Sequence, residues 1–225
     1  MMIPTQKPKV VIFDVDKTIT LSNSWYVLTE VLGADTSEHA RLYTAYKSGS
    51  IDWKEMRDGL FAIWKKYHKV ISKEDLLDLF FTIELRGDAV ATINELQDLG
   101  YEVALISSSI DIFVETVAER LAIKHWYANS IFVFDDNENW IDFKYDKDEA
   151  GHKLRQLQSF MEERELTKDD VIVVGDGESD IEMFRAVPGV AVHSDLDHLN
   201  RMAWEQIKYL PKLTQLLQSL PDRKD

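Results

Sequence analysis

The sequence predicts an α/β protein: a doubly wound, Rossmann-like parallel sheet with a small α-helical domain inserted after its first strand. Short apolar runs alternate with amphipathic segments along most of the 225 residues. Most of the apolar runs are continuous and do not alternate with polar residues, which is typical of strands buried on both faces of a parallel sheet. Strands and helices that follow one another with short links are the pattern of a doubly wound sheet.

The elements of the core are predicted from these two patterns. We expect strands over residues 9–13, 102–107, 130–134, 171–175 and 189–193. We expect the helices of the core over residues 88–99, 110–122, 149–165, 179–186 and 206–219.

The interval 22–86 interrupts this alternation, because it contains no convincing strand. Its pattern predicts helices over 23–32, 36–47, 52–67 and 73–82. We therefore expect a core domain of residues 1–21 and 87–225, and a helical cap domain of residues 22–86. Large apolar side chains recur at helical spacing in the third helix and favour the inner face of a small helical bundle over an aromatic substrate cage. These side chains are Trp53, Met56, Leu60, Ile63, Trp64 and Tyr67.

Composition excludes several classes of function. The formal net charge of −14 argues against nucleic acid or an anionic membrane as a partner. No segment has the ~18 uninterrupted apolar residues of a membrane span, and the first residues lack the apolar region of a secretory signal, so the cytoplasm is the expected location. The chain has no cysteine, which excludes disulfides, thiolate metal sites and cysteine nucleophiles.

Four carboxylates follow two of the predicted strands. Asp14 and Asp16 come after the first strand, and Asp176 and Asp180 come after the strand 171–175. The carboxyl ends of parallel strands meet at one edge of the sheet, where ligands bind. Carboxylates gathered there repel one another unless a cation lies among them, and Mg²⁺ prefers such oxygen ligands.

A serine cluster and several lysines are candidates for binding an anion. Ser107, Ser108 and Ser109 follow the second strand and precede a predicted helix, where hydroxyl and amide groups can bind phosphate. Taken alone, the cluster could equally be a plain serine N-cap. Lys153, at the start of the helix 149–165, could supply a fixed positive charge, and its rivals are Lys17, Lys147 and Lys168.

These motifs together resemble the haloacid dehalogenase superfamily of phosphatases. The motifs are DVDKT at 14–18, Ser107, Lys153 and GDGESD at 175–180, in that order and at the expected strand ends. The helical insert after the first motif resembles the C1-type cap of the phosphoserine phosphatase-like branch. The resemblance covers nearly the whole chain.

The resemblance implies a Mg²⁺-dependent phosphomonoester hydrolase that acts on a small phosphorylated metabolite. It implies that Asp14 attacks phosphorus to form an aspartyl-phosphate, and that Asp16 serves as general acid and then as general base. It implies a metal site of Asp14, the backbone carbonyl of Asp16, Asp176 and Asp180. It also implies that Ser107, the Ser108 amide and Lys153 hold the phosphoryl oxygens.

The substrate side of the sequence departs from phosphoserine-specific members of that branch. Asn23 stands where they have a glutamate for the substrate amine, and Leu60 where they have an arginine for its carboxylate, although Arg57 lies one turn away. The cap positions Asn23, Tyr46 and Trp53, together with Trp25, instead suggest a less charged or more apolar leaving group. Phosphoserine is therefore not the expected substrate.

Four other interpretations compete with a hydrolase. DKTIT, starting at Asp16, resembles the phosphorylation motif of cation pumps, but those have membrane spans and a glycine in place of Ile19. A receiver module of two-component signalling would be about half this length and would lack the insert. A haloalkanoate dehalogenase would not need Asp16. A phosphotransferase to an alcohol acceptor stays open, as does the oligomeric state.

Overall fold

The structure, a computed structural model, describes residues 1–223 and contains a seven-stranded sheet in the order β4-β3-β2-β1-β5-β6-β7. Neighbouring strands are parallel except β3 and β4, which are antiparallel. The predicted α/β fold class, with a doubly wound parallel sheet and a helical insert, is confirmed. The strands are β1 (Val10–Phe13), β2 (Glu102–Ile110), β3 (His125–Phe134), β4 (Trp140–Lys144), β5 (Val171–Gly175), β6 (Gly189–Val192) and β7 (Glu205–Ile207).

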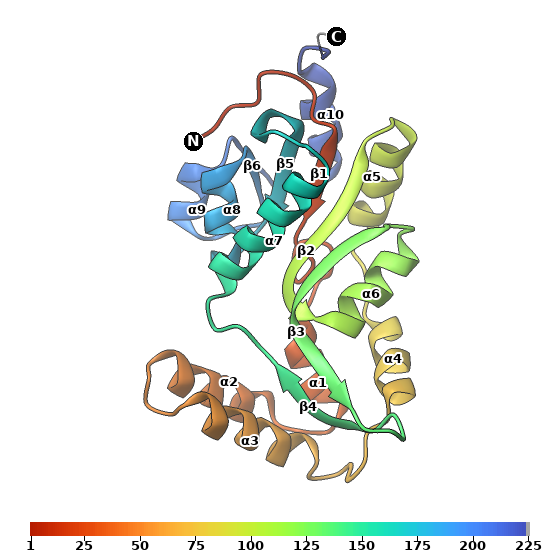
Figure 1. Ribbon diagram of the computed structural model, residues 1–225, viewed down its shortest axis with the longest axis vertical. Helices are drawn as coiled ribbons and strands as arrows, with labels where there is room; N and C mark the ends of the chain where they lie inside the picture. Colours follow the sequence, from red (N-terminus) through yellow and green to blue (C-terminus); the bar gives the residue numbers. More distant parts are fainter. Residues whose placement is uncertain (224–225) are drawn as a thin grey trace.

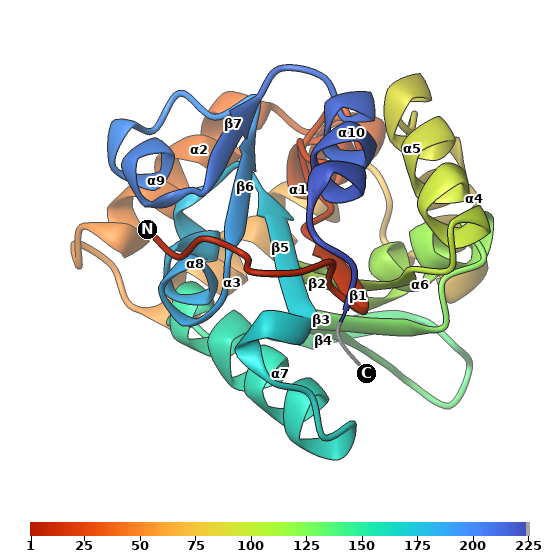
Figure 2. The ribbon, with the colours of Figure 1, turned by 90° about the horizontal axis from the view of Figure 1, so that it is seen from above.

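Helices cover both faces of the sheet, as Figure 2 shows from above. On one face lie α7 (Glu149–Glu163), α8 (Ile181–Ala186) and α9 (Asp197–Met202), and on the other lie α5 (Gly87–Asp98), α6 (Asp111–Arg120) and α10 (Pro211–Ser219). Short 3₁₀ turns, Lys168–Asp170 and Glu178–Asp180, flank β5. Successive side chains of β1 alternate between two cores, because Val10 and Ile12 pack toward α7 and α8 while Val11 and Phe13 pack toward α5 and α6. Both sets are fully buried, as continuous apolar strands predict.

The structure adds three elements that the sequence patterns did not predict. β4 pairs with the outer half of β3 in an antiparallel ribbon, and β3 itself begins at His125, five residues before the predicted 130. α9 was not predicted either, and β7 occupies the start of the predicted helix 206–219. That helix begins only at Pro211, whose fixed φ suits the first turn of a helix.

The insert between β1 and α5 is helical, and no strand forms within residues 22–86 of the described chain. Its helices are α1 (Ser24–Val31), α2 (Thr36–Lys47), α3 (Trp53–Trp64) and α4 (Lys73–Thr82). Figure 1 shows α2 and α3 together beyond one end of the sheet, away from both termini, while α4 lies beside α6. The four helices therefore do not form one separate bundle, and the domain boundaries at residues 22 and 86 stay a prediction.

One face of α3 is buried. Met56, Leu60 and Trp64 are buried, whereas Tyr67, beyond the helix, is 61% exposed. The indole Nε1 of Trp64 donates a hydrogen bond to Thr29 Oγ1 at 2.9 Å, which joins α3 to α1. A capping box between Asp52 and Glu55 fixes the start of α3.

Among residues 1–223, no helix is both long and apolar enough to cross a membrane.

Candidate active site

Three aspartates converge at the carboxyl end of the sheet. Asp14 follows β1, and its backbone amide donates a 2.9 Å hydrogen bond to Val174 O of the adjacent β5. Asp176 and Asp180 follow β5. Each of the three offers a carboxylate oxygen, and these oxygens all lie within 4.8 Å of one another. The structure therefore brings together three of the four carboxylates that the sequence placed at this edge.

Lys153 lies between two of these carboxylates. Its Nζ is 2.5 Å from Asp14 Oδ1 and 2.7 Å from Asp180 Oδ1, and its side chain is fully buried in α7. Burial alone would lower the pKa of Lys153, but the charges of Asp14 and Asp180 raise it above its ordinary value. Burial raises the pKa of Asp14, and the Lys153 ammonium opposes that rise. Lys153 therefore favours the ionised form of Asp14.

Asp16 lies apart from this group and is held by the first residue of α1. The backbone amide and the hydroxyl of Ser24 donate hydrogen bonds to its two carboxylate oxygens at 2.8 and 2.9 Å, and Ser24 Oγ also contacts Ser109 Oγ. Burial and the nearby charge of Asp14 raise the pKa of Asp16 to about 7. The next residue, Lys17, is exposed and has a φ of 64°, so the chain turns in the left-handed region directly after Asp16.

Hydrogen bonds hold Asp176 and Asp180 in place after β5. Thr18 Oγ1 donates to Asp176 Oδ1 at 2.9 Å, so Thr18 connects the two acidic motifs and does not merely stabilise its own turn. Burial and the charges of Asp14 and Asp180 raise the pKa of Asp176 to about 7. The amides of Asp176 and Gly177 donate to Asp180 Oδ2 at 3.2 and 3.1 Å. A Cβ on Gly175 would lie 2.3 Å from that oxygen, so a side chain at 175 would displace Asp180.

The charge and the donor atoms at this edge fit a divalent cation. Asp14, Asp176 and Asp180 supply hard oxygen donors that lie within 4.8 Å of one another. Lys153 supplies one positive charge, and the pKa values of Asp14 and Asp176 remain raised beside it. The group could therefore hold a metal ion that compensates the remaining negative charge.

The serine cluster does not cap a helix. Ser107, Ser108 and Ser109 belong to β2, and the N-cap residue of α6 is Ile110, which makes no side-chain capping hydrogen bond. The plain N-cap interpretation is therefore wrong. Ser107 Oγ accepts from the Ser109 amide at 3.3 Å, whereas Ser108 Oγ is buried with no partner among the described residues. All three serines line the same cleft as the aspartates.

This cleft, of about 230 Å³, lies between the sheet edge and the helices α1, α2 and α3. It is smaller than the ~300–1,000 Å³ of pockets for drug-sized ligands, so it suits a small molecule. The lining opposite the aspartates is largely aromatic and apolar. Its members are Trp25, Tyr26, His39, Tyr43, Trp53, Met56, Leu60, Phe143 and Tyr145.

The predicted cap residues have different positions relative to the cleft. Trp53 lines it. Asn23 also lines it, but its side chain accepts the amides of Trp25 and Tyr26 and so serves as the N-cap of α1. Tyr46 does not line the cleft within the described chain; it packs edge-on against Trp53, with ring centroids 6.0 Å apart, and faces a separate hollow.

Glu149, Tyr43 and Tyr145 are cleft residues that sequence reasoning missed. Tyr43 Oη donates to Glu149 Oε1 at 2.9 Å, and Tyr145 Oη contacts the same oxygen. One signal was available, because Glu149 precedes Lys153 by four residues in one helix, a spacing that places both side chains on the same face. The partner Tyr43 could not be found this way, since it lies 106 residues away in sequence.

Comparisons with known proteins agree with this arrangement. The family model described as haloacid dehalogenase-like hydrolase matches residues 11–185. The phosphoserine phosphatase of Methanocaldococcus jannaschii is 25% identical over 190 residues, which cover 80% of this chain and 82% of that protein. The phosphoserine phosphatase of Lactococcus lactis is 28% identical over 176 residues, covering 76% of this chain and 77% of that protein.

Solved structures share the fold. A HAD family hydrolase from Salmonella enterica serovar Typhi has a TM-score of 0.79 at 19% identity, covering 97% of this chain and 75% of that chain. A substrate-bound phosphoserine phosphatase has a TM-score of 0.71 at 21% identity, covering 96% of this chain and 99% of that chain.

Proposed function

The chain belongs to the haloacid dehalogenase-like hydrolases, and from this membership we propose that it hydrolyses a small phosphomonoester through an aspartyl-phosphate on Asp14, with Mg²⁺ as cofactor. Its curated relatives are phosphoserine phosphatases, and it is accordingly a phosphatase that acts on phosphomonoesters. The observation that carries the proposed mechanism is the pairing of Asp14 with buried Lys153, next to a separately held Asp16.

In the first step, a carboxylate oxygen of Asp14 attacks phosphorus and the bond from phosphorus to the leaving oxygen breaks. The attack requires an ionised Asp14, which contact with Lys153 favours. Asp16 gives its proton to the leaving alkoxide, so that an alcohol departs. A pKa raised to about 7 keeps much of Asp16 protonated near neutral pH and suits it to this task.

In the second step, Asp16 takes a proton from water, and the resulting hydroxide attacks phosphorus. The bond from phosphorus to Asp14 breaks, which releases inorganic phosphate and restores both aspartates. Ser24 keeps Asp16 in one orientation through both steps, because its amide and hydroxyl bind different carboxylate oxygens. Asp16 thus alternates between acid and base without moving.

Phosphoryl oxygens would be bound by Ser107, Ser108 and Lys153, all at the same sheet edge. Asp14, Asp176, Asp180 and the backbone carbonyl of Asp16 would hold Mg²⁺. When bound, the ion neutralises negative charge on the transferring phosphoryl group. Helices α2 and α3 would exclude water from the reacting groups. The expected location of the protein is the cytoplasm.

The test is a Mg²⁺-dependent assay with p-nitrophenyl phosphate, comparing wild type with Asp14→Asn and with the control Asp195→Asn at an exposed position. We expect Asp14→Asn to lose at least ~10³-fold in kcat and the control to match wild type. Rapid acid quenching with labelled substrate should trap phosphate on wild type and on the control, but not on Asp14→Asn. Full activity of Asp14→Asn would contradict the mechanism. Product analysis with added alcohols distinguishes hydrolysis from transfer to an alcohol acceptor.

A further inference from the structure

Glu149 places a carboxylate in the cleft at a short distance from the phosphoryl site. Glu149 and Lys153 are four residues apart in α7 and so project from the same face, one helical turn apart. Lys153 contacts the proposed nucleophile Asp14, and Glu149 lines the same cleft. The carboxylate therefore faces the region that the leaving alcohol must occupy.

One oxygen of this carboxylate is already bound by the protein and the other is not. Tyr43, Tyr145 and Lys47 all approach Oε1, the lysine at 3.5 Å. No donor within residues 1–223 is directed at Oε2. Burial raises the pKa of both tyrosines, and the Glu149 charge raises it further, so both are hydroxyl donors that fix the carboxylate. Lys47 is half exposed, and ion pairs of that kind contribute little.

Aromatic rings line the same cleft as this carboxylate. Tyr145 stacks on Trp53 with ring centroids 5.3 Å apart and an interplanar angle of 15°. Phe143 lies edge-on to Trp53 at 5.2 Å and 5.3 Å from Trp25. Ring faces beside a carboxylate are an environment that binds an ammonium group, because the negative ring faces and the carboxylate charge both attract it.

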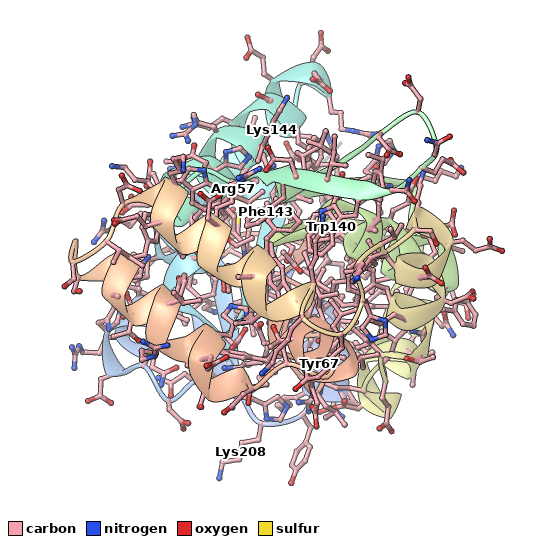
Figure 3. All side chains as sticks on the ribbon, turned by 90° about the horizontal axis from the view of Figure 1, so that it is seen from below. Arg57, Tyr67, Trp140, Phe143, Lys144 and Lys208 are labelled. Carbon is pink, nitrogen blue, oxygen red and sulfur yellow. The ribbon has the colours of Figure 1, made fainter. Side chains whose placement is uncertain are left out.

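Within residues 1–223, no arginine lines the cleft to bind a substrate carboxylate. Arg57, the nearest cap arginine in sequence terms, donates through Nε to Asp142 of β4 at 2.5 Å and through Nη1 to Asp58 at 2.7 Å. Figure 3 shows it on α3 beside the strand that carries Phe143 and Lys144. Burial lowers the pKa of His39 to about 4, so this lining residue is neutral near neutral pH. Within residues 1–223 the cleft lining has one lysine, the exposed Lys17, and no arginine.

We propose that the substrate is the phosphate ester of a small amino alcohol without a carboxylate, whose ammonium group is bound by Glu149 and the rings of Tyr43, Trp53 and Tyr145. This inference rests on the proposed function and names the leaving group for that site. It also refines the expectation of a less charged leaving group. Compared with phosphoserine, the proposed substrate lacks the carboxylate and retains the ammonium group.

Four phosphomonoesters that differ in their alcohol group test the inference on the wild-type enzyme. They are phosphoethanolamine, phosphocholine, O-phosphoserine and the dimethylbutyl phosphate in which carbon replaces the quaternary nitrogen of phosphocholine. We expect kcat/KM for the better of the two cationic esters to exceed that for phosphoserine and for the neutral isostere by at least about tenfold. Equal or faster turnover of phosphoserine or of the neutral isostere would overturn the inference.

Substitution of Glu149 tests the residue itself. In Glu149→Gln, the ratio of kcat/KM for the cationic ester to kcat/KM for the neutral isostere should fall about tenfold. Glu162→Gln, the same charge change at an exposed position of α7, should keep the wild-type ratio. An unchanged ratio in Glu149→Gln would refute the role of Glu149. Absence of hydrolysis of every ester, p-nitrophenyl phosphate included, would instead overturn the proposed function and this inference with it.

Discussion

The ammonium nitrogen of Lys153 lies 2.5 Å from Oδ1 of Asp14 across a fully buried contact. Asp14 directly follows the first strand, and Lys153 lies in a helix 139 residues later. Charges in a buried pair depend on each other, because removal of one leaves the other without compensation. The ionisation of Asp14 therefore depends on the residue at position 153 of α7 as well as on the surroundings of Asp14 at the end of β1.

Lys153→Met should nearly abolish activity while keeping the volume of the side chain. Asp14 would lose the charge that opposes the rise of its pKa, and the phosphoryl group would lose a positive partner. We expect kcat/KM to fall at least ~100-fold and its acid limb to move to higher pH. The measurement is a pH–rate profile, with Lys168→Met at an exposed lysine as the control. A profile like that of wild type would show that Asp14 does not depend on Lys153.

Gly175→Ala should weaken metal binding and stability together. The new Cβ would lie 2.3 Å from Asp180 Oδ2, so Asp180 would have to leave its hydrogen bonds with the 176 and 177 amides. We expect a loss of about 1–3 kcal/mol in the free energy of unfolding. We also expect a higher Mg²⁺ concentration for half-maximal activity.

Gly87→Ala is the matched control for that substitution, since a Cβ at the start of α5 meets nothing within 4 Å. Its stability should equal or exceed that of wild type by up to about 1 kcal/mol. Urea unfolding and metal titrations of the two variants measure both effects. If Gly175→Ala matched Gly87→Ala in both assays, close approach of Asp180 to the backbone would not matter.

His39 should make the protein less stable in mild acid. Burial lowers its pKa from 6.5 to about 4, so between these values the unfolded chain binds more protons than the folded one. Its contribution is fully present above the unfolded pKa and is lost as pH falls toward 4, by up to about 3 kcal/mol. The neutral ring is held by contact of Nδ1 with Thr29 Oγ1 at 2.7 Å.

Urea unfolding at several pH values measures this loss. In His39→Asn, the decrease in stability between about pH 6.5 and 4 should be smaller than in wild type by roughly that amount. His68→Asn, at an exposed histidine, should keep the wild-type dependence. The same pH slope in His39→Asn and in wild type would show that His39 titrates normally in the folded protein.

The sequence predicted which aspartates meet at this edge of the sheet, because they follow strands that local patterns reveal. Asp14 and Asp176 directly follow β1 and β5, and adjacent parallel strands bring their ends together whatever else the chain does. The pairing of Lys153 with both Asp14 and Asp180 could not be derived from its position alone, since an isolated lysine is typically on the surface. The motif combination identified the lysine, and the structure supplied its partners.

The aromatic half of the cleft was less predictable because it depends on packing between distant segments. β4 is a five-residue edge strand, and its pairing with β3 is what brings Phe143 and Tyr145 to Trp53. The ring periodicity of α3 predicted a buried face but did not distinguish Trp64, which is enclosed, from Trp53, which was placed at the substrate by its cap position and does line the cleft. Helical spacing predicts which side chains share a face but not which residues that face contacts.

Removal of metal should destabilise wild type much more than Asp176→Asn. Without metal, ionised Asp176 is disfavoured by burial and by Asp14 and Asp180, which raise its pKa to about 7. Asparagine removes that charge and can still accept the Thr18 hydrogen bond, so the metal-free variant should melt above metal-free wild type at mildly alkaline pH.

Mg²⁺ at about 100 times its Kd should stabilise wild type by about 2.7 kcal/mol, or about 5–10 °C in Tm. The variant, with one carboxylate ligand fewer, should show a much smaller rise, whereas Asp195→Asn at an exposed position should behave as wild type. Thermal melts in chelator and in Mg²⁺ give all of these values, and equal metal-induced shifts in wild type and Asp176→Asn would exclude Asp176 as a ligand.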